Sequence, residues 1–183
     1  LFAMGQMYER LAVTNKASEA YSTIRKKYRT GNIIVAARIR EAQIALRQRM
    51  PERAVDILGG IDAEILSLSA GDSLLPFPIS EAVGQVRILR TNALIMRGGF
   101  AEALDSATAY LRESPPDRNV PLVRLQSAFC MLNLDSSDDA LLHLDKIIDQ
   151  VTDDASPIRQ QALLYRALAL RQSGMPEKAV ADF

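Results

Sequence analysis

Several residue types are scarce in this sequence, and each scarcity excludes a class of protein. The 183 residues include no tryptophan, one histidine (His143) and one cysteine (Cys130). A single cysteine cannot form an internal disulfide, and one histidine with one cysteine cannot form a zinc cluster. The 22 basic and 22 acidic residues give zero net charge, which argues against a general nucleic-acid or membrane-surface binder. No apolar run approaches the length of a membrane span.

The sequence also lacks the motifs of common catalytic sites. It has no G-x-G-x-x-G turn, phosphate loop or G-x-S-x-G elbow. His143 and Asp145 are two positions apart in a helical pattern, so they lie on different faces. The acidic clusters "SSDDA" and "TDDAS" occur where helix starts favour acids, which we prefer to calcium binding as their explanation. We therefore predict a protein that is not an enzyme and that needs no cofactor and no metal.

A helical pattern recurs along the chain. Five amphipathic runs begin with an acidic residue one or two positions before an alanine, and each follows a helical segment and a short break. These marker alanines are Ala20, Ala54, Ala103, Ala140 and Ala179, at spacings of 34, 49, 37 and 39. The breaks hold Asn15, Met50-Pro51, Gly98-Gly99, 135–137 and 174–176. Glycine suits the end of one helix and proline the start of the next, so the pattern predicts an all-α fold of about five antiparallel helix pairs.

The spacing of 34 between Ala20 and Ala54 equals the length of the tetratricopeptide repeat (TPR), and the chain resembles that family. The family keeps a small residue twelve positions before the marker alanine. The residues there are Tyr8, Ala42, Thr91, Ala128 and Ala167. In the first repeat, Gly5 with Ala17 offers a competing register. The resemblance implies a right-handed superhelix, or α-solenoid, in which the first helix of each pair lines a concave groove and the second helix lies outside.

The repeats divide one predicted domain into five segments, at about 1–30, 33–68, 80–114, 120–151 and 157–183. The long interval holds an insertion at about 69–79, after a second helix expected to run to about Leu68. We expect Leu74, Leu75 and Phe77 to fold back over the repeats, and a partner-docking element is the alternative. The sequence starts without methionine and stops within the fifth repeat, so we expect a fragment of a longer chain, whose localisation is left open.

The zero net charge conceals a separation of charge between helices. First helices of repeats two to five hold eleven arginines and two acids, whereas second helices of repeats two to four hold twelve acids and three bases. Arg38, Arg87 and Arg124 each lie sixteen residues before their marker alanine. Such a ladder suits carboxylates or phosphates on a partner. Alternatively, these arginines pair with second helices inside the fold.

We predict a scaffold or adaptor segment of a larger assembly, which binds a protein or peptide partner, acidic or phosphorylated, in a basic groove. The resembling family clamps a carboxylate with basic residues fifteen positions before the marker alanine, and the residues there are Gly5, Ile39, Ile88, Leu125 and Leu164. None is basic, so that clamp is absent, and the groove is partly apolar or the first helices pack tightly, including between subunits. Two alternatives are an RNA-binding helical repeat, which the few aromatic residues disfavour, and a regulatory domain that senses a ligand. The predicted groove residues are Arg38, Gln43, Arg87, Asn92 and Arg124.

Overall fold

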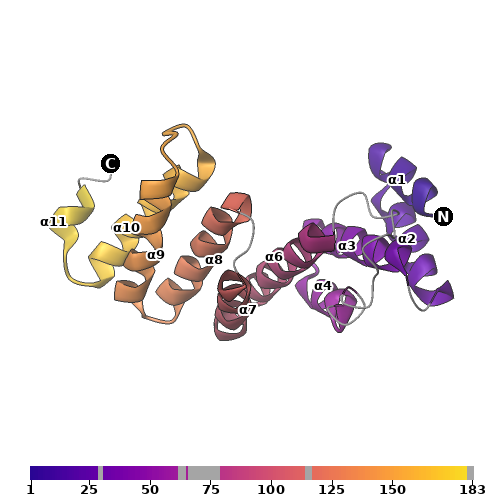
Figure 1. Cartoon of the computed structure of the whole chain (residues 1–183), viewed down its shortest axis with the longest axis horizontal. Helices are drawn as coiled ribbons and strands as arrows, with labels where there is room; N and C mark the ends of the chain where they lie inside the picture. The colour runs from indigo at the N-terminus through magenta and orange to yellow at the C-terminus, as the bar shows by residue number, and fades with distance from the viewer. Residues whose placement is uncertain (29–30, 62–64, 66–78, 114–116, 181–183) are drawn as a thin grey trace. The chain divides into compact units, whose positions relative to one another are not determined.

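The structure, a computed structural model, describes residues 1–28, 31–61, 65, 79–113 and 117–180. Within these ranges every regular element is a helix, as the sequence predicts (Figure 1). The first helices are α1 (Phe2–Arg10), α3 (Asn32–Arg47), α6 (Ile79–Arg97), α8 (Val120–Asn133) and α10 (Pro157–Gln172). The second helices are α2 (Thr14–Lys27), α4 (Pro51–Leu58), α7 (Phe100–Arg112), α9 (Ser137–Gln150) and α11 (Pro176–Ala179). A short 3-10 turn, η1 (Asp117–Asn119), precedes α8.

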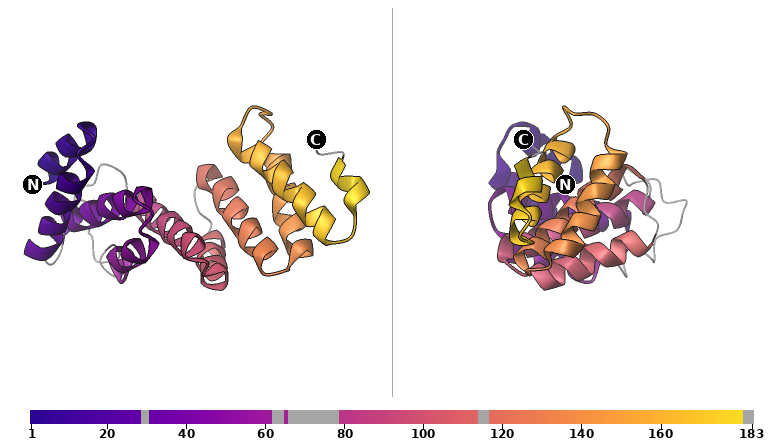
Figure 2. Two further views of the ribbon diagram at one scale, coloured as in Figure 1. Left: turned by 180° about the vertical axis from the view of Figure 1, so that it is seen from behind. Right: turned by 90° about the vertical axis from the view of Figure 1, so that its left-hand side faces the viewer.

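The chain forms two compact units, Leu1–Arg97 and Gly98–Phe183, with the boundary between α6 and α7. In each unit, helices that follow one another in sequence pack side by side (Figures 1 and 2). Neighbour-on-neighbour packing is how helical repeats build a core. The single domain expected from the sequence stays a prediction.

The repeated small residues hold the helix pairs together. In the last four pairs the marker alanine is the fourth residue of the second helix, and in α2 that position belongs to Ala17. Ala17 is fully buried, and a Cβ added to Gly5 would lie 2.6 Å from Cε1 of Tyr21. Gly5 and Ala17 are therefore the true pair of the first repeat, and the register through Tyr8 and Ala20 was wrong. Ala20 misled because it is buried on the same face of α2.

Two predicted helix boundaries need correction. The first break lies at 11–13 and not at Asn15, because Ala12 adopts a positive φ of 56° and α2 has already begun at Thr14. The second helix of repeat two was expected to reach Leu68, but α4 ends at Leu58. Gly59 is extended and Gly60 has a φ of 70°, a conformation that suits glycine, so the backbone leaves the helix there. The insertion lies outside the described residues, with Leu74, Leu75 and Phe77, up to Ile79, where α6 begins.

The core of each unit is built from the inward faces of these helices. In the first unit, Tyr21 and Ile24 of α2 pack with Ile44 of α3, and a second cluster joins α3, α4 and α6. In the second unit, Leu144 and Ile147 of α9 pack against α8 and α10. Every helix that contributes to these clusters is held by its neighbours in sequence.

Candidate functional site

Arg38 attaches α3 to the end of α4. Its side chain is buried, its Nε donates to the carbonyl oxygen of Ile57 at 2.7 Å, and its Nη2 donates to the carbonyl oxygen of Gly59. The last carbonyls of a helix have no N–H partner within the helix and lie at the negative end of its dipole. Arg38 therefore caps the C-terminus of α4 with charge-assisted hydrogen bonds.

Two further arginines of first helices reach the end of a second helix in the same way. Arg90 of α6 donates to the carbonyl oxygen of Leu58, also at the end of α4, at 2.8 Å. Arg159 of α10 donates through Nη1 to the carbonyl oxygens of Ile148 and Val151, the latter at 2.8 Å, where α9 ends. Some of the arginines concentrated on first helices thus serve inside the fold, where they bind the carbonyl oxygens at the ends of second helices.

The predicted groove residues are distributed over both compact units. Arg124 of α8 donates through Nη1 to Oε1 of Gln150, the last residue of α9, at 2.6 Å. Arg38 and Arg124 therefore contact second helices of their own repeats, although Arg124 is only half-buried. The other predicted residues are half-buried, Gln43 on α3 and both Arg87 and Asn92 on α6. Because Arg124 belongs to the second unit, a ladder of the three arginines stays a prediction.

Glu41 of α3 forms an ion cluster that the sequence did not reveal. Its carboxylate is fully buried, with Nε of Arg25 at 3.3 Å from Oε2 and Nη2 of Arg53 at 3.2 Å from Oε1. The same Arg53 nitrogen donates to Oγ of Ser18 at 2.9 Å. The arginine side chains are 40% and 44% exposed, so the charges meet at the edge of the core. Glu41 thereby ties α3 to α2 and α4. The only sequence signal was an acid within an arginine-rich helix.

The two scarce residues, Cys130 and His143, lie in the second unit. Cys130 is fully buried in α8, as the apolar pattern around it predicts. Burial raises the pKa of its thiol to about 11, so the thiol stays protonated near neutral pH and is a poor nucleophile. His143 is half-buried on α9, and burial lowers its pKa, with further lowering by Lys146 and Arg124.

We expect the free energy of unfolding of the second unit to fall as the pH drops from about 7.5 to about 5.5. The pKa of His143 is lower in the folded state than in the unfolded chain. As the pH falls, the unfolded chain therefore takes up the proton first, and this stabilises it relative to the folded state. His143→Leu should weaken this dependence, which denaturation at the two pH values can measure. Identical pH dependence in both proteins would contradict this account.

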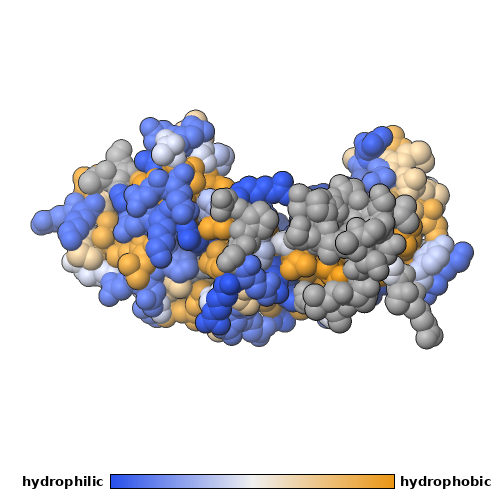
Figure 3. Space-filling model, viewed as in Figure 1, coloured by the Kyte–Doolittle hydropathy of each residue, from blue (hydrophilic) through white to orange (hydrophobic). Residues whose placement is uncertain are grey.

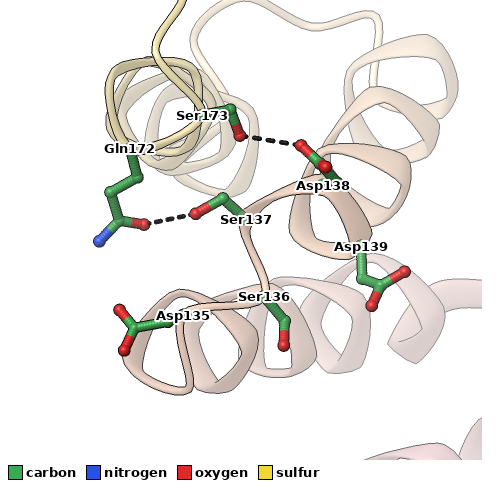
Figure 4. A pocket seen from close by; sticks show the side chains of 7 residues that line it. All are labelled: Asp135, Ser136, Ser137, Asp138, Asp139, Gln172 and Ser173. Carbon is green, nitrogen blue, oxygen red and sulfur yellow. Dashed lines mark hydrogen bonds between the residues drawn. The ribbon is translucent and has the colours of Figure 1, made fainter.

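A polar pocket lies where the turn between α8 and α9 meets the end of α10 (Figure 4). Its volume is about 390 Å³, and its walls include Asp135, Asp138 and Asp139. Oγ of Ser137 donates to Oε1 of Gln172 at 2.8 Å, and Oγ of Ser173 donates to Oδ1 of Asp138 at 2.9 Å (Figure 4). The cluster "SSDDA" thus starts α9 and attaches it to α10. Among the described residues, no group of side chains is arranged to hold a metal ion.

A smaller apolar pocket lies between α10 and α11. Its volume is about 190 Å³, and its walls include Leu164, Leu168 and Arg171. Leu164 is 46% exposed, and Arg171 is exposed as well. Leu168 lies eleven residues before its marker alanine, the register position that Phe129 holds on α8. Phe129 packs on Tyr165 of α10 with ring centroids 5.4 Å apart, so apolar side chains continue from α8 onto α10.

No helix in the described ranges is long and apolar enough to cross a membrane.

No family model and no curated protein matches the sequence. The structure is similar to two crystal structures from a Podosopora anserina protein described as a kinesin light chain. Both show TPR-like repeats that are nearly identical to one another within that protein, and one of the two carries a substitution. The TM-scores are 0.72 and 0.71, and the sequence identity is 13% in both cases. Each match covers 99% of this chain, and the two cover 88% and 89% of the other chains, respectively. The chain therefore has the TPR-like fold, an all-α solenoid of helix pairs.

Proposed function

We propose that the chain is a non-catalytic protein-interaction module, a scaffold or adaptor segment, that binds a partner segment at the apolar pocket between α10 and α11. The TPR-like fold supports interaction with proteins in general. The pocket itself carries the proposal, because Leu164 and Leu168 form an apolar hollow with the exposed Arg171 beside it. Small pockets of this kind combine apolar contact area with a few polar groups that fix orientation.

The pocket chemistry favours a partner residue that is apolar and has an acidic neighbour. Burying one large apolar side chain contributes about 1.5–3 kcal/mol. A guanidinium group binds carboxylates and phosphates through paired hydrogen bonds. Arg38 is buried and caps α4, so we assign acid recognition to arginines that reach solvent, with Arg171 first. We therefore keep the proposal of an acidic or phosphorylated partner made from the sequence. The residue proposed to bind its acidic group is now Arg171 on α10.

Selection from two peptide libraries tests this proposal on the whole chain. One library surrounds random apolar residues with aspartate and glutamate, and the other places lysine at the same positions. We expect the acidic library to yield ligands whose affinity falls about tenfold, or by about 1.4 kcal/mol, in both Leu164→Glu and Arg171→Ala. The readout is fluorescence polarisation of labelled peptides.

Matched substitutions in the same compact unit serve as controls. Leu142→Glu on α9 changes another exposed leucine, and Arg112→Ala on α7 changes another exposed arginine. Neither should alter the affinity. Equal selection from both libraries, or ligands insensitive to changes at Leu164 and Arg171, would contradict the proposal.

A further inference from the structure

Helix α1 is apolar on two opposite faces. Its inner face packs on α2, where Phe2 lies 5.5 Å from Tyr21 between ring centroids. The outer face presents apolar side chains spaced three, three and four residues apart. Figure 3 shows apolar residues gathered at the N-terminal end of the chain, where α1 lies. Those side chains are Met4 and Met7 of α1, which are 41% and 52% exposed, and the flanking Leu1 and Leu11, which are 46% and 63% exposed. A surface helix ordinarily has one apolar face, and a second such face indicates that something covers it.

The repeat register shows what kind of element fits this outer face. Met7 lies ten residues before its marker alanine, Ala17. The residues at that position in the four later first helices are all fully buried, and they are Ile44, Ala93, Cys130 and Ala169. Ile44 packs against Tyr21 and Ile24 of α2, the second helix of the preceding repeat. The outer face of α1 is therefore shaped to receive an amphipathic helix.

The charges around α1 select the partner. Apart from Arg25, which pairs with Glu41, the exposed charged residues of the α1–α2 hairpin are four bases and one acid, namely Arg10, Lys16, Lys26, Lys27 and Glu19. Nζ of Lys16 lies 5.7 Å from the ring centroid of Tyr8, so one ammonium group is held against α1 itself. A symmetric pairing of two such hairpins would bring like charges together, which disfavours a second copy.

We propose that the outer face of α1 binds an acidic amphipathic helix of a partner protein. The chain's own second helices show the required chemistry, since α9 has an apolar face and four aspartates against one lysine. The proposed surface lies in the first compact unit, whereas the pocket on α10 lies in the second. It goes beyond the proposed function because it gives the chain a second binding surface, as an adaptor requires.

A synthetic peptide with the sequence of residues 137–150, helix-stabilised and fluorescently labelled, is a direct probe. We expect the whole chain to bind it about tenfold more tightly than a version with its aspartates replaced by lysine. Met4→Glu with Met7→Glu should weaken binding about tenfold, whereas Leu142→Glu, another exposed apolar site, should leave it unchanged. Unchanged helicity and thermal unfolding would show that the double variant folds.

Three outcomes would overturn the proposal. The first is equal binding of the aspartate and lysine peptides, or binding that survives the double substitution. The second is no peptide binding, together with sedimentation on phosphatidylserine–phosphatidylcholine vesicles that the double variant loses, which would assign the face to a membrane surface. The third is no peptide binding, together with a concentration-dependent dimer that the double variant abolishes, which would assign it to a second copy. Each leaves the test of the α10 pocket unaffected.

Discussion

Arg38→Met is expected to lower the free energy of unfolding of the first compact unit by about 3 kcal/mol. Methionine keeps the apolar stem of the side chain but removes the donors to the carbonyl oxygens of Ile57 and Gly59. The carbonyl of Ile57 is buried and that of Gly59 is partly buried, and leaving them unpaired costs the desolvation energy that the guanidinium group offsets. Urea denaturation followed by circular dichroism measures the change.

Arg47→Met on the same helix is the matched control for this experiment. Its guanidinium group lies 3.4 Å from Oε2 of Glu9, with a side chain that is 56% exposed. Exposed pairs of this kind contribute about 0–1 kcal/mol. Equal losses at Arg38 and Arg47 would show that the cap on α4 contributes nothing beyond an ordinary surface contact.

Arg25→Met combined with Arg53→Met is expected to cost about 3–5 kcal/mol of unfolding free energy. The double variant leaves the fully buried carboxylate of Glu41 without either of its positive partners. A buried charge without a partner is strongly destabilising, whereas the arginines alone can turn toward water because they are partly exposed. The loss should therefore exceed that caused by Glu41→Leu alone.

Adding Glu41→Leu to the double variant tests this reasoning. It removes the unpaired charge and fills the site with an apolar side chain, so it should recover most of the lost stability. Denaturation of wild-type, double and triple variants under the same conditions gives the comparison. A triple variant less stable than the double variant would show that Glu41 stabilises the fold by other contacts.

The sequence predicted the helix pairs because their boundaries have local causes. Proline at the start of α4 and glycine just after α6 mark helix boundaries through their own backbone preferences. Those preferences belong to the residue type and can be read from the sequence. The first repeat was misregistered because Ala17 and Ala20 are both small and both buried, so spacing could not distinguish them. The close approach of Gly5 to Tyr21 distinguishes them in the structure.

The candidate sites were harder to predict because they depend on distances between helices. The sequence placed arginines on first helices, but it could not show that Arg38 reaches the end of α4 while Arg171 stays exposed. The same holds for Glu41, whose partners come from two other helices. The outer face of α1 became recognisable only after the register was corrected, because Met7 then aligned with four buried residues.

The central claim is that the arginines of the first helices divide into caps inside the fold and anchors for a partner. Measuring both unfolding and peptide affinity for Arg38→Met and Arg171→Ala tests it most directly. We expect Arg38→Met to lose stability while its folded fraction keeps full affinity, and Arg171→Ala to keep stability while losing affinity about tenfold. The opposite pattern, with Arg38 needed for affinity and Arg171 for stability, would contradict the claim.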